Sequence, residues 1–283
     1  MLVLTGCEKT ENIILSADYN YNNVVCYEKA VSSSTMYVPN EVSRDFLNTY
    51  NVEPDMTLYK TCQITSATDG TSFMLNSVAE CIPSDFYKAL MRGMQMELEL
   101  TPVTLEYGRA NSGEYYFSSS DFNEGDEYIM VNPPESFNYR SGGVDTRDPE
   151  SIRSFVTKFM REDNEIETLT ENGEVIGYKV NLSLDSQTFS YLSNLFDSTK
   201  VFPPKKTYEN YEGWLTFDKN GRLAEVCLHA YGVSESPIDW AMKEEEYKIY
   251  ADFFYDSETD FSLPPEYTTY IDYADIKDYF ENG

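Results

Sequence analysis

The strongest alternation of apolar and polar residues in this chain lies at residues 94–101. There every second residue is apolar, which predicts a strand with one buried and one solvated face. Segments 113–117 and 127–131 predict two further strands. At 148–161 the apolar residues instead recur every three to four positions after an Asp-Pro start, which predicts an amphipathic helix. The chain therefore mixes half-buried strands with helices.

Two Asn-Gly pairs, at 172–173 and 220–221, separate apolar segments of strand length. This pair favours the tight turn of an antiparallel hairpin because both residues accept a positive φ. We therefore expect a hairpin around each pair. The same reasoning gives the remaining elements, which are a hairpin at 59–79, a strand at 246–255, and short helices at 41–50, from 84 onward, at 186–196 and at 272–280.

The order of these elements predicts the fold class. Strands and helices do not alternate regularly, and no glycine-rich phosphate loop follows a strand. Both observations argue against a doubly wound parallel sheet and for an antiparallel sheet in an α+β arrangement. Neither an internal repeat nor a sharp change in composition marks a second domain. We expect a single domain over residues 36–283, a tether over 8–35, and the remnant of a signal peptide over 1–7.

The N-terminus carries the most specific motif. An apolar residue and two small residues precede a cysteine and then a polar stretch, and this resembles the bacterial lipobox: Leu4-Thr5-Gly6-Cys7. The resemblance implies cleavage before Cys7, a diacylglyceryl group on its sulfur, and a protein outside the cytoplasm. Two acyl chains suffice for stable membrane anchoring. Only Met1 to Leu4 precede the motif, against the roughly 7–15 apolar residues of a signal segment. The alternative is an ordinary thiol near a frayed end.

The other four cysteines are Cys26, Cys62, Cys81 and Cys227. An extracytoplasmic location permits disulfides, and four cysteines allow three pairings. The favoured pairing is Cys62 with Cys81, because these two flank the hairpin turn at 68–71. The alternative is four free, buried thiols. Metal binding is disfavoured because the sequence contains no Cys-x-x-Cys pair.

Composition narrows the possible chemistry. The 283 residues carry 21 Lys+Arg against 49 Asp+Glu, a formal net charge of −28. Nucleic acids are bound through clustered basic residues, so we expect no nucleic-acid partner. The single histidine, His229, excludes zinc sites built on several histidines. It shares a strand face with Cys227, but side chains two apart on a strand lean in parallel, which disfavours a Cys–His nucleophile. Residues 121–127 faintly resemble a calcium loop, with a polar hairpin loop as the default. We expect neither cofactor nor metal.

The chain also resembles a family in its order of elements, over roughly residues 85–270. The resemblance rests on successive short hairpins, the helix at 148–161 between them, the hairpin at 213–221 and the Pro264-Pro265 end. These features are similar to those of the LolA/LppX-like bacterial lipoproteins. The resemblance implies a half barrel, which is a curved antiparallel sheet with helices packed on its concave face. It also implies a cavity used in several members for acyl chains or other lipids, and no catalytic residues.

The expected function is therefore a membrane-anchored, extracytoplasmic lipoprotein, non-catalytic, that binds or carries an apolar, lipid-like ligand. The ligand-binding residues are not identifiable from the sequence. On the strand 222–232 the small residues Ala224, Val226, Leu228 and Ala230 share one face, which suits a narrow pocket or a filled core equally well. A filled core would favour the alternative, a surface interaction or envelope-sensing lipoprotein. A glycan hydrolase with two paired carboxylates is the less favoured third hypothesis.

Overall fold

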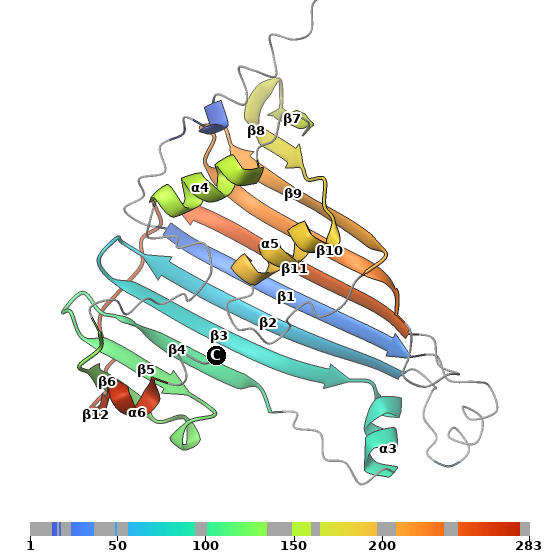
Figure 1. Cartoon of the computed structure of the whole chain (residues 1–283). Coiled ribbons are helices and arrows are strands. Elements are labelled where there is room, and N and C mark those ends of the chain that lie inside the picture. Colours follow the sequence, from blue (N-terminus) through green and yellow to red (C-terminus); the bar gives the residue numbers. More distant parts are fainter. Residues whose placement is uncertain are drawn as a thin grey trace, which may run out of the picture.

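The computed structural model describes residues 13–15, 17, 24–36, 49, 56–93, 101–134, 149–159, 165–196, 208–234 and 243–277. Within these ranges the molecule is built on one large sheet with few helices (Figure 1). The strands are β1 Val24–Met36, β2 Met56–Thr68, β3 Phe73–Pro83, β4 Val103–Arg109, β5 Tyr115–Ser119, β6 Glu127–Val131, β7 Ile166–Glu171, β8 Glu174–Asn181, β9 Asn210–Asp218, β10 Leu223–Ser234, β11 Lys243–Tyr255 and β12 Thr269–Asp272. The helices are α3 Asp85–Gly93, η1 Asn123–Gly125, α4 Pro149–Phe159, α5 Ser186–Phe196 and α6 Tyr273–Ile276.

The twelve described strands form a single open sheet in the order β12-β6-β5-β4-β3-β2-β1-β11-β10-β9-β8-β7. Every pair is antiparallel except β12 with β6, which is parallel. The expected antiparallel sheet is thus confirmed. The middle of the sheet joins distant parts of the sequence, because β1 lies between β2 and β11 and pairs with both over its whole length.

The place of β1 differs from the expectation of a tether over residues 8–35. Thirteen residues from Val24 to Met36 form a central strand. Three successive serines at 32–34 gave no apolar alternation, so the sequence pattern did not identify a strand there. Backbone pairing with two long neighbours supplies the hydrogen bonds that hold this polar segment in the sheet.

The hairpin turns form where the sequence predicts them. Asn172 and Gly173 connect β7 and β8 with φ of 51° and 84°. Gly221 has φ of 84° in the turn between β9 and β10. In the β2–β3 turn the Asp69 carboxylate accepts hydrogen bonds from the backbone N–H groups of Thr71 and Ser72, at 2.8 and 2.6 Å. Local turn chemistry therefore fixes the register of three hairpins.

The helices agree with the predicted ranges in part. α4 and α5 lie within the expected segments, α3 begins after Ser84, and α6 is shorter than the expected helix at 272–280. The Ser84 hydroxyl accepts a hydrogen bond from the Tyr87 N–H at 3.2 Å, as an N-terminal cap does. The helix expected at 41–50, apart from Thr49, and the strand expected at 94–101, apart from Thr101, lie outside the described residues.

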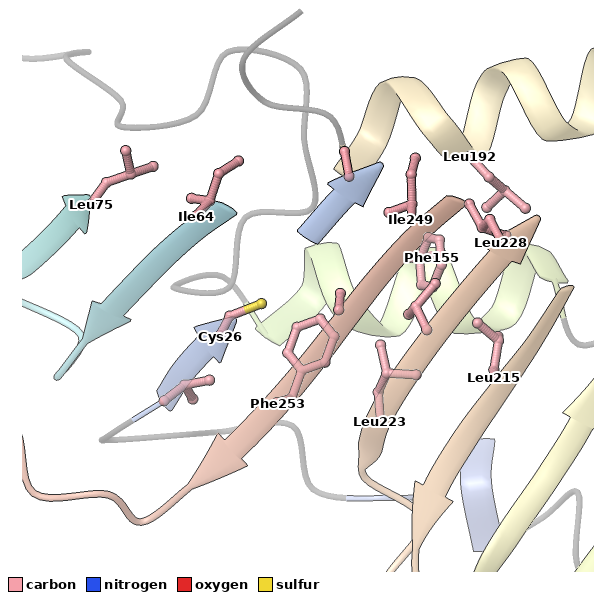
Figure 2. Packing of buried hydrophobic residues seen from close by; sticks show 14 of the residues in the cluster. Cys26, Ile64, Leu75, Phe155, Leu192, Leu215, Leu223, Leu228, Ile249 and Phe253 are labelled. Atoms are coloured by element: carbon pink, nitrogen blue, oxygen red, sulfur yellow. The ribbon is translucent and has the colours of Figure 1, made fainter. Parts of the chain in front are cut away.

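We call the side of the sheet on which α4 and α5 lie the helix face (Figure 1). Figure 2 shows Leu192 of α5 and Phe155 of α4 among side chains from β9, β10 and β11. Their partners include Leu215, Leu228 and Ile249, which are 0%, 0% and 1% exposed. A side chain with no accessible surface borders no space wide enough for water, so the helix face is filled at this place. Each buried Leu or Ile contributes about 1.5–3 kcal/mol to folding.

The other side, which we call the open face, is partly covered by the chain itself. After β11 the backbone turns at Asp256, where φ is 58°, and residues 256–268 cross this face. We call these residues the strap. Phe261 of the strap packs on Val25 and Ala67, and Tyr267 packs on Tyr116 and Ile129. The strap thus covers part of the open face.

Candidate functional site

The open face carries a groove beside the strap, which we call the aromatic groove. Its volume is about 410 Å³. The floor and walls come from β1, β2, β3 and β11, and the rim comes from the strap: Val25, Tyr27, Thr65, Ala67, Met74, Phe254, Ser257, Glu258 and Thr259. Strand alternation places these residues together, since they occupy open-face positions on four neighbouring strands. The result is an apolar floor with a hydroxyl- and carboxylate-bearing edge.

Two aromatic rings dominate the groove. Tyr27 and Phe254 are 49% and 50% exposed. Their ring centroids lie 5.5 Å apart with an interplanar angle of 73°, so the edge of one ring meets the face of the other. Large apolar side chains that stay half-exposed around a hollow are typical of binding surfaces. The pair therefore marks the groove as a candidate ligand site.

A second hollow of about 560 Å³ lies where β1 and β10 end and β11 begins. We call it the acidic hollow. His229 and Tyr231 form part of its wall, with their rings stacked at a centroid distance of 4.7 Å. Four carboxylates add negative charge: Glu209, Glu244, Glu245 and Glu246.

His229 is held between two carboxylates from neighbouring strands. Its Nε2 lies 2.9 Å from Glu246 Oε1, and its Nδ1 lies 3.8 Å from Glu212 Oε2. Lys248 Nζ also lies 2.6 Å from Glu246 Oε1. Partial burial raises the pKa of Glu246, but Lys248 and His229 outweigh burial and hold that pKa below its ordinary value. Both ring nitrogens of His229 therefore face a glutamate carboxylate.

The Cys227 thiol does not have the environment of a nucleophile. It is 1% exposed, and burial, followed by the nearby Glu225 charge, raises its pKa to about 12. At neutral pH such a thiol stays protonated, whereas nucleophilic cysteines act as thiolates. His229 is directed to Glu246 rather than to this sulfur.

Cys26, Cys62, Cys81 and Cys227 form no disulfide in the structure. Cys62 pairs with Ala79 in the β2–β3 register, and Cys81 pairs with Lys60. Cys62 and Cys81 are therefore diagonal neighbours on adjacent strands. The Cα atoms of such neighbours lie about 7–8 Å apart, which is beyond the usual Cα–Cα distance across a disulfide. A bond between them would need the backbone to shift, and the pairing stays a prediction. Cys7 and its motif lie outside the described residues.

The loop at residues 121–127 is a polar turn tied to its own hairpin. Asn123 Nδ2 donates to the Tyr128 hydroxyl at 2.9 Å, and that hydroxyl donates to Asp126 Oδ2 at 3.1 Å. Across the part of the chain that the structure describes, no three Asp, Glu, His or Cys side chains converge as metal ligands. The helices described there include none long and apolar enough to cross a membrane.

Sequence reasoning missed the aromatic groove for two identifiable reasons. Tyr27 fell in the segment interpreted as a tether. Phe254 lies in a strand whose apolar positions alternate through Ala251 and Phe253, so an open-face position should be polar. An aromatic residue at a polar position was the available signal, and it points to recognition rather than to the core.

Comparison with known proteins finds weak structural neighbours. No family model matches the chain, and no curated protein matches its sequence. A LolA superfamily protein from Nitrosomonas europaea is a weak structural neighbour, with 10% identity, a TM-score of 0.15, and coverage of 90% of this chain and 95% of that one. The enduracididine biosynthesis enzyme MppR aligns at 10% identity and a TM-score of 0.12, over 83% of this chain and 86% of its own. At such TM-scores the functional interpretation must come from this chain's own geometry.

Proposed function

We propose that this protein is a lipid-anchored, extracytoplasmic binding protein without a catalytic role, which accommodates an apolar, lipid-like group in the aromatic groove. The sequence motif ending at Cys7 supports the anchor and the location. The groove supports the binding role.

The half-exposed ring pair carries this proposal. Tyr27 and Phe254 stand at 49% and 50% exposure above an apolar floor formed by Val25, Ala67 and Met74. Covering both rings with an apolar group would remove their remaining surface from water, at about 25 cal/mol for each Å². A groove of about 410 Å³ lies within the usual range of small-molecule sites, roughly 300–1,000 Å³.

The resemblance to half-barrel lipoproteins suggested a ligand between a concave sheet face and its helices. Around Leu192, Leu215 and Leu228 that space is filled, because all three side chains are 0% exposed. The aromatic groove lies on the opposite face, over the central strands β1, β2 and β11. We therefore place the apolar ligand there.

The same filled packing favours a second candidate role, a surface interaction module that binds another macromolecule without carrying a lipid. Tyr59 and Ile82, at 47% and 49% exposure, extend the apolar character of the open face beyond the groove. The two roles differ in what covers the rings of Tyr27 and Phe254, which is a small apolar molecule in the first role and the surface of a partner in the second.

Titration with the neutral apolar dye N-phenyl-1-naphthylamine tests the groove. We expect dye fluorescence to rise on binding and Phe254→Ala to weaken binding about tenfold, because one wall of the recess is lost. Tyr59→Ala is the matched control, since Tyr59 is equally exposed on the same face and does not line the groove. Equal affinities for both variants would contradict the groove as the binding site.

The anchor is tested separately in a bacterial host. We expect the wild-type protein to fractionate with membranes and to carry the mass of a diacylglyceryl group. Cys7→Ser should lose both that mass and the membrane association, as read by mass spectrometry and fractionation. Unchanged fractionation of the variant would contradict lipid anchoring at Cys7.

A further inference from the structure

We propose that the ligand of the aromatic groove is an amphiphile with a positively charged amine head group. This inference rests on the proposed function and adds the chemical class of the ligand. Three observations carry it: the arrangement of the two rings, the charges around them, and the contrast with other aromatic rings of the same protein.

The rings of Tyr27 and Phe254 form a corner rather than a flat wall. At an interplanar angle of 73° and a centroid separation of 5.5 Å, the corner exposes a ring face and a ring edge to the same space. The face of an aromatic ring carries partial negative charge and attracts ammonium groups within about 6 Å of its centroid. Corners of aromatic rings are the usual surroundings of alkylated ammonium groups in proteins.

Carboxylates predominate beside the corner, where Lys29, two residues from Tyr27 on the same face of β1, is the neighbouring cation. Glu258 lines the groove, and Asp252 stands directly opposite Tyr27 in the β1–β11 register. Asp252 in turn faces Glu225 across the β10–β11 pair, and two like charges in that position repel each other. Burial, followed by Glu225, raises the pKa of Asp252, as expected for crowded carboxylates. A bound cation would relieve this repulsion, whereas an anionic head group would add to it.

These three carboxylates form no ion pair with any Lys or Arg of the described residues. By contrast, Asp218 and Asp256 share Arg222, at 2.7 and 3.3 Å. No ion pair within the described residues therefore neutralises these three carboxylates. The overall charge of −28 acts in the same direction, since it favours the approach of cations.

Elsewhere the protein places its own cations on aromatic rings. Lys158 lies 3.5 Å from the Tyr191 ring centroid, Lys179 lies 4.5 Å from that of Trp214, and Arg222 lies 4.6 Å from that of Tyr255. Among the described residues, no lysine or arginine takes this position on Tyr27 or Phe254. The ring corner of the groove thus offers a cation site that the described chain leaves to a ligand.

The test uses three decyl amphiphiles that differ only in head group: decyltrimethylammonium, decyl maltoside and decyl sulfate. Each displaces N-phenyl-1-naphthylamine from the full-length protein below its micelle concentration, with near-ultraviolet circular dichroism confirming that the fold persists. We expect decyltrimethylammonium to displace the dye at about tenfold lower concentration than the neutral maltoside, and the sulfate to be the weakest. Added salt should reduce the difference between the three.

Glu258→Gln is the informative variant because it removes one charge of the groove and keeps the shape. We expect it to lower the preference for the ammonium head over the neutral maltoside head about threefold. Glu244→Gln removes a charge from the acidic hollow and is the matched control, which separates a local effect from the general attraction of cations to an acidic protein. Equal displacement by all three heads, or equal effects of both variants, would overturn the head-group inference and leave the apolar groove standing. Absence of dye binding would instead contradict the proposed function itself.

Discussion

The two faces of the sheet share every strand and yet differ in what they do. In β11 the residues on the helix face, from Tyr247 to Phe253, are at most 5% exposed, whereas the next open-face residue, Phe254, is 50% exposed. Adjacent residues of one strand therefore experience the interior and the solvent in turn. Side chains of α4 and α5 pack on the helix face, and the strap packs on part of the open face. The difference teaches that residues of the filled core and residues left exposed to solvent alternate along the same strands.

The largest expected effect is a difference in the stability lost when one isoleucine on each face is replaced by alanine. Ile249 is 1% exposed on the helix face, and Ile82 is 49% exposed on the open face. We expect Ile249→Ala to lower the free energy of unfolding by about 2–5 kcal/mol, because it leaves a cavity in a filled core. Ile82→Ala removes the same atoms and should cost less than about 1 kcal/mol. Urea denaturation followed by circular dichroism measures both, and similar losses would contradict the assignment of the faces.

The sequence predicted the elements whose signals are local. Both Asn-Gly hairpins, the strand at 127–131 and the helix at 186–196 depend on turn residues or on periodicity within a dozen positions. The strand β1 was missed because its evidence is not local. Glu28 occupies a helix-face position and is only 4% exposed, so a charged residue stands where the pattern calls for an apolar one.

The candidate site was missed for the same physical reason. Its lining comes from four strands and from the strap, and their proximity depends on the pairing of β1 with β11, more than 200 residues later in the chain. Single-sequence patterns report which face of a strand is buried. They do not report which strands become neighbours in the sheet. A groove lined by several strands forms only when the fold brings those strands side by side. An aromatic residue at a position expected to be polar can be assigned to a site only once its neighbouring strands are known.

A smaller effect distinguishes the two Asn-Gly turns. Gly173 and Gly221 both have φ of 84°, but a Cβ on Gly173 would meet nothing, whereas one on Gly221 would lie 2.6 Å from the Ile13 carbonyl oxygen. Gly173→Ala should therefore cost only the backbone strain, about 1 kcal/mol. Gly221→Ala should cost about 2–3 kcal/mol, since it also displaces the helical turn at residues 13–15, where Ile14 is 0% exposed. Equal losses in urea denaturation would contradict the packing of this turn against the β9–β10 hairpin.

The smallest expected effect is a pH dependence of the free energy of unfolding, which arises in the part of the open face that the strap covers. Glu106 of β4 lies beneath the strap, where it accepts a hydrogen bond from Tyr267, and burial, followed by repulsion from Glu266 and Glu127, raises its pKa above the ordinary value of 4.5. A raised pKa means that the folded protein binds the proton more tightly than the unfolded chain. The stability linked to this proton is present below the unfolded-state pKa and is lost as the pH rises through the folded-state pKa.

Glu106→Gln mimics the protonated carboxyl and can still accept the Tyr267 hydrogen bond. We expect the variant and the wild type to have similar free energies of unfolding near about pH 4, and the variant to be the more stable of the two near about pH 7. Glu171→Gln, on the exposed edge strand β7, is the control for the loss of one negative charge from a strongly acidic protein. A pH-dependent gain confined to Glu106→Gln would separate the strap-covered region of the open face from its solvated region. If both variants gained equally, the effect would be one of net charge, and the strap would then contribute no pH dependence of its own.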